Sequence, residues 1–476
     1  MPIPQDRTRY QQLANDLSVA IGEGRLPPGS MLPSIRESAR RHKVSVNTVI
    51  SAYRLLEDHG LVQSVPQSGF QVCSRLAEMD QPLQTGRVAN QSEKDLMALL
   101  LEAQGQSGVM DLAFAAPRGE KLFPGRALTR LTKQVLQERE SVVSTYALPP
   151  GSTLLREQIT RRAVLQGMAL GSEDIVLTHG ATEALQLALR AVAKAGDKVG
   201  IETPTYFNIY PLLDSLCLTG IEIPTHPRTG LVVEELESML ANVPLAAVVT
   251  MPTVQNPLGC TMPIQAKRQL ARLAAKYQLP VIEDTVYSDL QFGEPLQPSV
   301  RSFDEEGWVM VCGGFSKTLA PDYRLGWLEG GRFSQQIRRL KFTSSATESV
   351  LLSDTIGRYM LSGGYDRHLR TLRRIYQSNI ETVRGLVASH YPEGTRATQP
   401  DGGFVLWLEL PTHVHTTALF RQALELGVVF MPGELYSDSP RFINCMRIAC
   451  CRIADDEFID AIKLIGTLAK RGGPQM

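Results

Sequence analysis

Apolar residues recur at helical spacing three times within the first 60 residues of the chain, and then alternate with polar residues around a Pro/Ser/Gly turn. Spacings of three and four residues predict helices, whereas alternation predicts strands. The pattern therefore predicts three helices and a two-stranded hairpin, which is the element order of a winged helix-turn-helix. The predicted helices cover residues 8–24, 33–42 and 44–60, and the hairpin covers residues 61–72.

The composition changes after this hairpin. Residues 75–108 are rich in Gln, Ser, Ala and Gly, and within them only residues 93–104 have a helical pattern. Such a composition is typical of a linker that lets two domains move independently. The sequence thus predicts an N-terminal domain over residues 1–74, a linker over residues 75–108 and a second domain over residues 109–476.

Helices alternate with short apolar runs in the second predicted domain, and several of these runs end in polar residues. This is the α/β pattern, in which the carboxyl ends of parallel strands carry the chemistry. The predicted strands are residues 174–178, 198–202, 246–250, 280–284 and 308–312.

The composition of the 476 residues is that of an ordinary globular protein, with 43% hydrophobic and 21% charged residues and a formal net charge of zero. Any nucleic-acid-binding surface must therefore be local. The seven cysteines form no CxxC pair and no His/Cys cluster at metal spacing, which predicts a reducing compartment and no metal site. The chain has no signal-peptide core and no run of about 18 apolar residues, so we expect no membrane span and a cytoplasmic location.

Basic residues gather just before the third predicted helix. Residues 1–75 contain nine basic and six acidic side chains, an excess of +3 that is concentrated between Arg36 and Lys43. This charge would face the phosphate backbone as the third helix enters the major groove, where the start of that helix contacts bases. The turn at Gln67, Ser68 and Gly69 is expected to reach the minor groove or the backbone. The predicted DNA-binding residues are Ser34, Arg36, Arg40, Ser45, Asn47 and Thr48.

The alternative for this region is a small helical domain for oligomer contacts, but the order of elements and the turn glycines favour DNA binding. Residues 8–73 also resemble the GntR family of bacterial regulators, which implies a double-stranded DNA operator as partner. Val46 departs from the family, because many members have an arginine there, and the contact of that arginine is absent or replaced. The matching residues are Leu26, Gly29, Leu32, Pro33, Ser34, Arg36, Val44, Ser45, Thr48, Val49, Ala52, Tyr53, Leu56, Gly60, Leu61, Gly69 and Phe70.

Lys317 lies in the run 313–321, between small residues and a proline turn, and Arg324 follows seven positions later. A Schiff-base lysine needs this environment, with the amine on a loop and groups nearby that hold a phosphate. Ser316 supplies a hydroxyl and Arg324 a bidentate cation for such an anion. Most lysines are solvated surface charges, so Lys317 alone is a weak signal.

A second part of the predicted anion site lies where a strand gives way to a helix, over residues 178–185. The main-chain N–H groups around Ala181 and Thr182, together with the helix dipole, attract an anion. A plain connection between strand and helix is the simpler alternative.

Polar and aromatic side chains follow the predicted strands. Asp284 can keep a pyridine nitrogen protonated, which makes the ring an electron sink. Tyr287 and the amide of Asn256 could bond the ring 3-oxygen, and Tyr206 could stack on the ring face. A capping aspartate, a turn asparagine and packed tyrosines are the simpler alternatives. Arg447 is a charge within an apolar run, so it needs a substrate carboxylate or an internal salt bridge as partner.

The order of these residues over positions 109–472 resembles fold-type I aminotransferases of the aspartate aminotransferase kind. The resemblance implies pyridoxal 5'-phosphate as cofactor, with Lys317, Asp284 and Tyr206 as catalytic residues. Tyr146 matches a tyrosine that reaches the phosphate of the neighbouring subunit, which implies a homodimer. The implied roles are a Schiff base for Lys317, the ring nitrogen for Asp284, the 3-oxygen for Asn256 and Tyr287, stacking for Tyr206, phosphate for Ser316 and Arg324, and the α-carboxylate for Arg447.

A GntR-like head joined to an aminotransferase-like body is the architecture of the MocR subfamily, which this chain resembles. The resemblance implies a transcriptional regulator in which pyridoxal phosphate or an amine or amino-acid effector modulates operator binding. An amine that displaces Lys317 is expected to shift the body and reposition the heads. An active aminotransferase with an accessory head is the alternative, with Lys317 as proton shuttle, and an inert dimerising scaffold is a third reading. The effector, the operator, the direction of regulation and head swapping in the dimer are left open.

Overall fold

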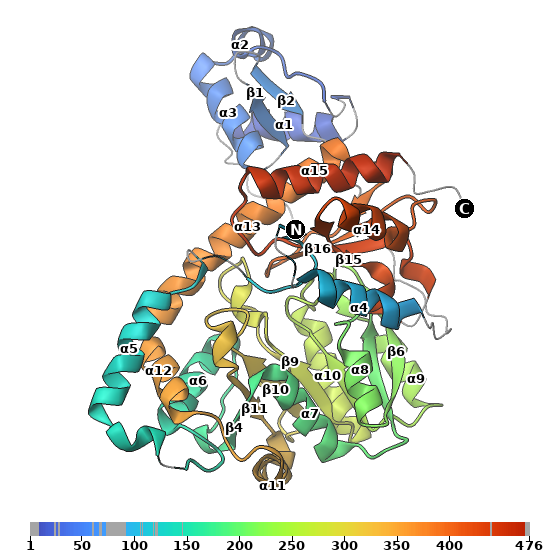
Figure 1. Cartoon of the computed structure of the whole chain (residues 1–476). Helices are drawn as coiled ribbons and strands as arrows, with labels where there is room; N and C mark the ends of the chain where they lie inside the picture. The colour runs from blue at the N-terminus through green and yellow to red at the C-terminus, as the bar shows by residue number, and fades with distance from the viewer. Residues whose placement is uncertain are drawn as a thin grey trace. The chain divides into compact units, whose positions relative to one another are not determined.

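The chain divides into two compact units, which we describe separately from a computed structural model (Figure 1). The smaller unit contains the N-terminal helices and hairpin, and the larger unit contains the remaining sheets. The structure describes residues 9–22, 25–26, 29–59, 61–65, 69–72, 92–104, 106, 108–117, 119, 122–144, 146–437 and 440–471. Gln67 and Ser68, at the predicted turn of the hairpin, lie outside these residues.

The N-terminal unit is a winged helix-turn-helix, as predicted. Leu13 and Leu17 of the first helix pack against Val49 and Tyr53 of the third, which explains their helical spacing. The third helix starts where it does because the Ser45 hydroxyl caps it and accepts the Thr48 N–H at 3.1 Å. The elements are α1 (Arg9–Gly22), α2 (Ile35–His42), α3 (Val46–Asp58) and the antiparallel strands β1 (Val62–Val65) and β2 (Gly69–Val72).

An eight-stranded sheet forms the centre of the larger unit, in the order β4-β11-β10-β9-β8-β5-β6-β7. The run from β10 to β6 is parallel, and β11 and β7 are antiparallel to their neighbours. All five predicted strands belong to this sheet, which confirms the α/β prediction. The strands are β4 (Ile175–Thr178), β5 (Lys198–Thr203), β6 (Thr219–His226), β7 (Gly230–Leu231), β8 (Ala247–Thr250), β9 (Val281–Asp284), β10 (Val309–Gly314) and β11 (Gly326–Glu329).

Helices cover both faces of this sheet, because its central strands are apolar on both sides. In β9, Ile282 packs in the same cluster as α7 and α8, whereas Val281 packs in the same cluster as α9 and α10. The helices of this unit are α5 (Gly125–Glu138), α6 (Thr153–Ala163), α7 (Gly180–Val192), α8 (Ile209–Ser215), α9 (Val233–Leu240), α10 (Ile264–Tyr277), α11 (Ser334–Ser344), α12 (Val350–Leu361), α13 (Gly364–His390), α14 (Thr416–Glu425) and α15 (Asp456–Lys470).

A smaller antiparallel sheet, in the order β12-β13-β16-β15, carries Arg447 on β16 directly opposite Trp407 on β13. A separate parallel pair joins β14 to β3 and so ties the start of the second predicted domain to the chain near residue 428. The strands are β3 (Met110–Asp111), β12 (Arg396–Ala397), β13 (Val405–Glu409), β14 (Val428–Val429), β15 (Met431–Pro432) and β16 (Cys445–Ala449).

The predicted linker contains one ordered element. Its helical pattern forms α4 (Ser92–Gln104), and Leu96, Leu100 and Ala103 on this helix are buried. This helix therefore packs against other residues instead of acting as a free tether, and residues 75–91 lie outside the described part. Among the described residues, no helix is both long and apolar enough to span a bilayer.

Candidate functional site

A cavity of about 190 Å³ lies at the carboxyl ends of β8, β9 and β10, where α/β folds bind their ligands. Every residue predicted to bind the cofactor lines this cavity, with the exception of Tyr146. The fold therefore brings together side chains that are up to 143 positions apart, from Ala181 to Arg324. The lining residues are Ala181, Thr182, Leu185, Tyr206, Met251, Asn256, Asp284, Val286, Tyr287, Gly314, Ser316, Lys317 and Arg324.

One end of the cavity is built to receive an anion. The first turn of α7 presents the N–H groups of Ala181 and Thr182, next to Ser316 and the exposed Arg324. Gly180 has φ +79°, and a Cβ there would lie 3.1 Å from the Arg324 guanidinium. Gly326 is also required, because its Cβ would lie 2.4 Å from the main chain of Gly180. These glycines let the loop of Arg324 approach the helix terminus closely.

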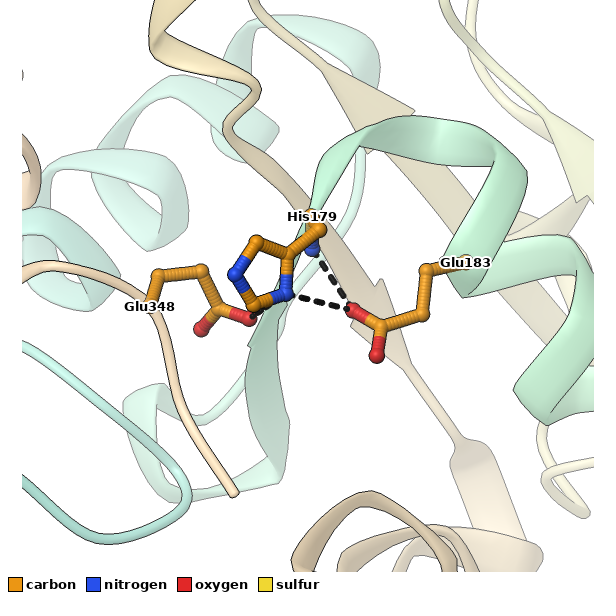
Figure 2. A group of neighbouring side chains, drawn as sticks. All are labelled: His179, Glu183 and Glu348. Carbon is orange, nitrogen blue, oxygen red and sulfur yellow. Dashed lines mark hydrogen bonds and ion pairs between the residues drawn. The ribbon is translucent and has the colours of Figure 1, made fainter. Parts of the chain in front are cut away.

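Behind the same turn lies a cluster of charged side chains (Figure 2). His179, Glu183 and Glu348 place one ligand-type atom each within 4.8 Å of one another. Lys341 already supplies the cation, since its fully buried ammonium donates to Glu183 at 2.8 Å and also to Glu348. The main-chain N–H of His179 donates to Glu183 at 2.6 Å. We therefore interpret the cluster as an ion-pair network that fixes the turn before α7.

Asp284 is the last residue of β9, and only 5% of it is exposed. Burial raises its pKa to about 6 from the ordinary 3.8, while the Val286 N–H at 3.1 Å and the charge of Lys317 act in the opposite direction. A buried carboxylate of this kind gains from a cationic partner. A protonated ring nitrogen in the cavity would provide it.

Lys317 extends from the loop after β10, and its Nζ donates to the carbonyl oxygen of Ala115 at 2.5 Å. Burial lowers the pKa of Lys317 to about 8, and the guanidinium groups of Arg447 and Arg324 act in the same direction. The amine is therefore partly neutral near physiological pH, as a nucleophilic lysine requires.

Asn256 connects the cavity to Arg447. The Oδ1 atom of Asn256 accepts from Arg447 Nη1 at 3.4 Å, which leaves the amide N–H₂ of Asn256 free to face a cofactor oxygen. Tyr287 is buried and packs edge-to-face on Phe404. Tyr206 lies in the loop after β5 and lines the cavity. Burial raises the pKa of both tyrosines, so both stay protonated as donors.

Arg447 is fully buried but does not line the cavity. Its Nη2 donates to the carbonyl oxygen of Ala113, and its Nε has no hydrogen-bond partner among the described residues. No carboxylate among the described residues forms a salt bridge with Arg447, so these residues do not provide the internal ion pair that was the alternative to a substrate carboxylate. A buried guanidinium with an unsatisfied N–H group is suited to bind an anion.

Three consecutive carbonyl groups thus receive donors from the site. Ala113 accepts from Arg447, Phe114 from the Cys451 thiol at 3.9 Å, and Ala115 from Lys317. We call these residues the 113–115 segment. It is anchored just before by Leu112, which exchanges main-chain hydrogen bonds of 2.8 Å with residues 429 and 449.

Tyr146 lies away from the cavity of its own chain and is 92% exposed. Val143 and Leu148 beside it are 72% and 63% exposed. An exposed apolar group of this size is typical of a surface that another protein covers.

The predicted DNA-contacting residues lie on the surface of the N-terminal unit. Arg36, Arg40 and Asn47 are exposed. Ser34 and Ser45 cap α2 and α3, and the Thr48 hydroxyl bonds to Ser45 at 2.8 Å. Two of the predicted base contacts, Ser45 and Thr48, therefore also hold the start of the third helix in place.

Sequence reasoning missed Glu202 and Gln255. Both are fully buried beside the cavity, and the Glu202 carboxylate bonds to the loop that carries Asn256. The only sequence signal for Glu202 is an acidic residue within an apolar run. That run was interpreted as a strand, and no separate role was assigned to its acidic residue.

Comparisons with known proteins agree with this geometry. Residues 107–464 match the family described as aminotransferase class I and II, and residues 9–72 match the bacterial regulatory proteins of the gntR family. An uncharacterized HTH-type transcriptional regulator of Escherichia coli, YjiR, is 34% identical over 98% of this chain and 99% of its own length. The HTH-type transcriptional regulator NorG of Staphylococcus aureus is 23% identical, over 87% of this chain and 94% of its own.

Two solved structures resemble the larger unit. Kynurenine aminotransferase of Pyrococcus horikoshii has 27% identity and a TM-score of 0.73, and the match covers 81% of this chain and 95% of the enzyme. The α-aminoadipate aminotransferase LysN of Thermus thermophilus, solved with N-(5'-phosphopyridoxyl)-L-leucine, has 25% identity and a TM-score of 0.72. That match covers 79% of this chain and 94% of the enzyme.

Proposed function

Because the chain belongs to the MocR-type regulators, in which a GntR DNA-binding domain is joined to a class I and II aminotransferase domain, we propose that ligands at Lys317 and Arg447 control its affinity for an operator. The protein is a DNA-binding transcriptional regulator, and its cofactor is pyridoxal phosphate. We propose roles for the individual cofactor-binding residues and a chemical class for the effector.

The cavity fits this cofactor. A phosphate would meet the first turn of α7, Ser316 and Arg324, and the ring nitrogen would meet Asp284, whose raised pKa reflects a buried charge without a cation in contact. The bound cofactor supplies an aldehyde that reacts with amines and a ring that withdraws electrons. Lys317 supplies the protein amine, and its lowered pKa makes that amine available.

One observation supports regulation in particular: both ligand-binding cations donate to the 113–115 segment. Arg447 does not line the cavity and its Nη2 is held by the Ala113 carbonyl, so a carboxylate that binds both Nη atoms would take the place of that carbonyl. Equally, a Lys317 that engages a ligand gives up Ala115. This segment follows the linker in the chain, so a ligand that carries an amine and a carboxylate would release the segment where the linker ends.

We expect the protein to act as a homodimer in the cytoplasm, where the operator is. The exposed Tyr146, Val143 and Leu148 would lie in the dimer interface, with Tyr146 at the phosphate of the partner subunit. An amino acid is the effector class that suits the site, since it offers an amine for the cofactor and a carboxylate for Arg447.

The test is operator binding by the purified protein. Fluorescence anisotropy with DNA from upstream of its own gene is measured alone, with pyridoxal phosphate, and with the cofactor plus each common amino acid. We expect at least one amino acid to change the affinity for DNA. If neither the cofactor nor any amino acid changes it, control by this site is ruled out.

A working aminotransferase is the second candidate, favoured by the intact set of Lys317, Asp284 and Tyr206 around one cavity. Lys317 could then act as the base that takes the proton from the α-carbon of the amino acid and passes it on in a 1,3-shift, for which its pKa of about 8 is suitable. Turnover of amino acid and 2-oxo acid pairs separates this candidate from regulation. Rapid turnover without any change in DNA binding would favour the enzyme.

A further inference from the structure

The loops that carry Tyr206 and Asn256 follow two neighbouring strands, β5 and β8, which pair in parallel. Each loop contains a cis peptide, at Pro204 and at Pro257. Both loops end in residues that line the cavity. The relative positions of the two loops therefore decide where Tyr206 and Asn256 would contact a cofactor ring.

Glu202, near the end of β5, is bound to the other loop by three hydrogen bonds. Its carboxylate accepts from the Thr250 hydroxyl at 2.8 Å, from the Met251 N–H at 3.1 Å and from the Gln255 amide at 3.4 Å. Only 1% of Glu202 is exposed. Burying a carboxylate is costly unless it is hydrogen-bonded. Three donors around one buried carboxylate therefore indicate that the position of the Glu202 side chain is fixed.

Gln255 completes the connection in the opposite direction. Its amide N–H₂ donates to the Pro204 carbonyl at 2.8 Å, and its Oε1 accepts from the Leu258 N–H at 2.8 Å. The side chain is fully buried. One glutamine thus holds the main chain two residues before Tyr206 and two residues after Asn256.

We propose that Glu202 and Gln255 are a positioning pair that sets Tyr206 and Asn256 against the cofactor ring. Neither side chain lines the cavity, so the pair acts through the two residues that do. The inference rests on cofactor binding in this cavity and is independent of the response to DNA. The loop of Asn256 also bonds to Arg447, so the pair also sets the position of that guanidinium.

Glu283 offers a matched control. It is also fully buried and also holds a loop, since it accepts from the Ser299 hydroxyl at 2.5 Å and from the N–H groups of Val300 and Arg301. It precedes Asp284, contributes charge near it and pairs through its main chain with Thr250, but its carboxylate accepts its hydrogen bonds from residues 299–301 and not from the loops of Tyr206 and Asn256. Removing Glu283 therefore tests for effects of charge or of stability alone.

The experiment compares Glu202→Leu, Glu202→Gln and Glu283→Leu in the full chain. Pyridoxal phosphate is titrated, and the visible absorbance of the bound cofactor is followed against pH. We expect Glu202→Leu to weaken cofactor affinity about tenfold or more and to shift the pH midpoint of the spectrum. Glu202→Gln, which keeps one acceptor oxygen and the same shape, should recover most of both. Glu283→Leu removes a charge that raises the pKa of Asp284, so it should lower the melting temperature and move the pH midpoint, but it should leave cofactor affinity at pH 8 unchanged.

Two results would overturn the proposal: wild-type cofactor affinity at pH 8 in folded Glu202→Leu, or the same loss of affinity in Glu283→Leu. If Glu202→Leu does not fold, Gln255→Met replaces it under the same criteria, because Gln255 carries no charge. Operator binding is measured in parallel. An amino-acid response of DNA binding that persists while the spectrum is unchanged would refute the positioning pair and leave the proposed function standing.

Discussion

Lys317 donates a hydrogen bond to the carbonyl oxygen of Ala115, 202 residues away in the sequence, at a distance of 2.5 Å. The amine that is expected to hold the cofactor is thus also bonded to the chain that enters the larger unit from the linker. Arg447 makes the same kind of bond to Ala113. Under the proposed function we therefore expect engagement of the site and release of this segment to be linked.

Replacing Lys317 by alanine removes the amine without adding bulk. We expect the purified variant to bind pyridoxal phosphate non-covalently and to lose the visible absorbance of the attached cofactor, together with any amino-acid response of operator binding. Absorbance after dialysis and anisotropy with DNA measure both. Lys276→Ala is the control, since Lys276 is a surface residue paired with Glu237. A Lys317→Ala protein that keeps its amino-acid response would contradict the proposed sensing.

Arg447→Gln removes the charge that a ligand carboxylate needs. We expect amino acids to act on the variant with about 10- to 100-fold lower affinity, because hydrogen bonds to charged groups are worth about 1.5–3 kcal/mol. Simple alkylamines, which have no carboxylate, should act as on the wild type. Spectral titration measures both ligand classes. Arg396→Gln, on the same small sheet and paired with Glu409, should leave both affinities unchanged.

We expect Asp284 to make the cofactor affinity depend on pH. Its pKa in the folded protein is about 6, above the ordinary 3.8, so its charged form is needed for a cationic ring but is disfavoured by burial. We expect affinity for pyridoxal phosphate to fall as pH decreases through 6. Asp284→Asn should bind the cofactor weakly and lose this dependence on pH.

The same shift predicts a stability effect of opposite sign in the cofactor-free protein. A carboxyl whose folded pKa is raised stabilises the fold when protonated, and this contribution is lost as pH rises from 3.8 through 6. Asp284→Asn should therefore be more stable than the wild type at pH 8, by on the order of 2 kcal/mol, with the gain shrinking as pH falls below 6 and nearly gone below about 3.8. Thermal denaturation across this range measures it, and the exposed Glu157→Gln should show no such trend. A loss of stability at pH 8 would contradict the burial argument.

Much of the cavity was predictable because its residues follow apolar strands. Asp284 ends β9, and Lys317 and Arg324 lie in the turn after β10, so local pattern alone brings them to one edge of the sheet. The 113–115 segment was not predictable, because its bonds join carbonyl groups, which carry no sequence signal, to residues as far as 337 positions away.

Glu202 escaped prediction for a different reason. Period and composition identify a strand, but they do not show whether an acid within it faces donors, and the donors come from the loop after another strand. The linker helix α4 was seen as a helical pattern, yet its burial depends on tertiary contacts that the pattern does not contain.

The DNA-binding residues make separable predictions. Arg36→Ala and Arg40→Ala should weaken binding to all sequences alike and each reduce the salt dependence by about one charge. Asn47→Ala should instead cost about 1–3 kcal/mol on the operator only, because Asn47 is exposed at the start of α3 and is expected to contact base edges. Anisotropy against salt, on operator and on unrelated DNA, distinguishes the two. Arg161→Ala, exposed on α6, is the control. If Asn47→Ala lost the same affinity for the operator and for unrelated DNA, Asn47 would contact the phosphate backbone instead of the bases.

Tyr146 offers a test of the dimer. It is 92% exposed in its own chain and lies outside the cavity, so a role at the phosphate requires the partner subunit. Tyr146→Ala should therefore weaken cofactor binding by about tenfold through loss of one charged hydrogen bond.

The decisive measurement mixes Tyr146→Ala chains with Lys317→Ala chains and isolates the hybrid dimer by two affinity tags. If Tyr146 acts across the interface, one of the two sites has both residues intact, because its lysine and its tyrosine come from different chains. We then expect half of the sites in the hybrid to bind pyridoxal phosphate covalently with wild-type affinity. If Tyr146 acted within its own chain, no site in the hybrid would be intact and the wild-type affinity would be absent. Tyr277→Ala, another exposed tyrosine, should leave cofactor binding unchanged in the same assay.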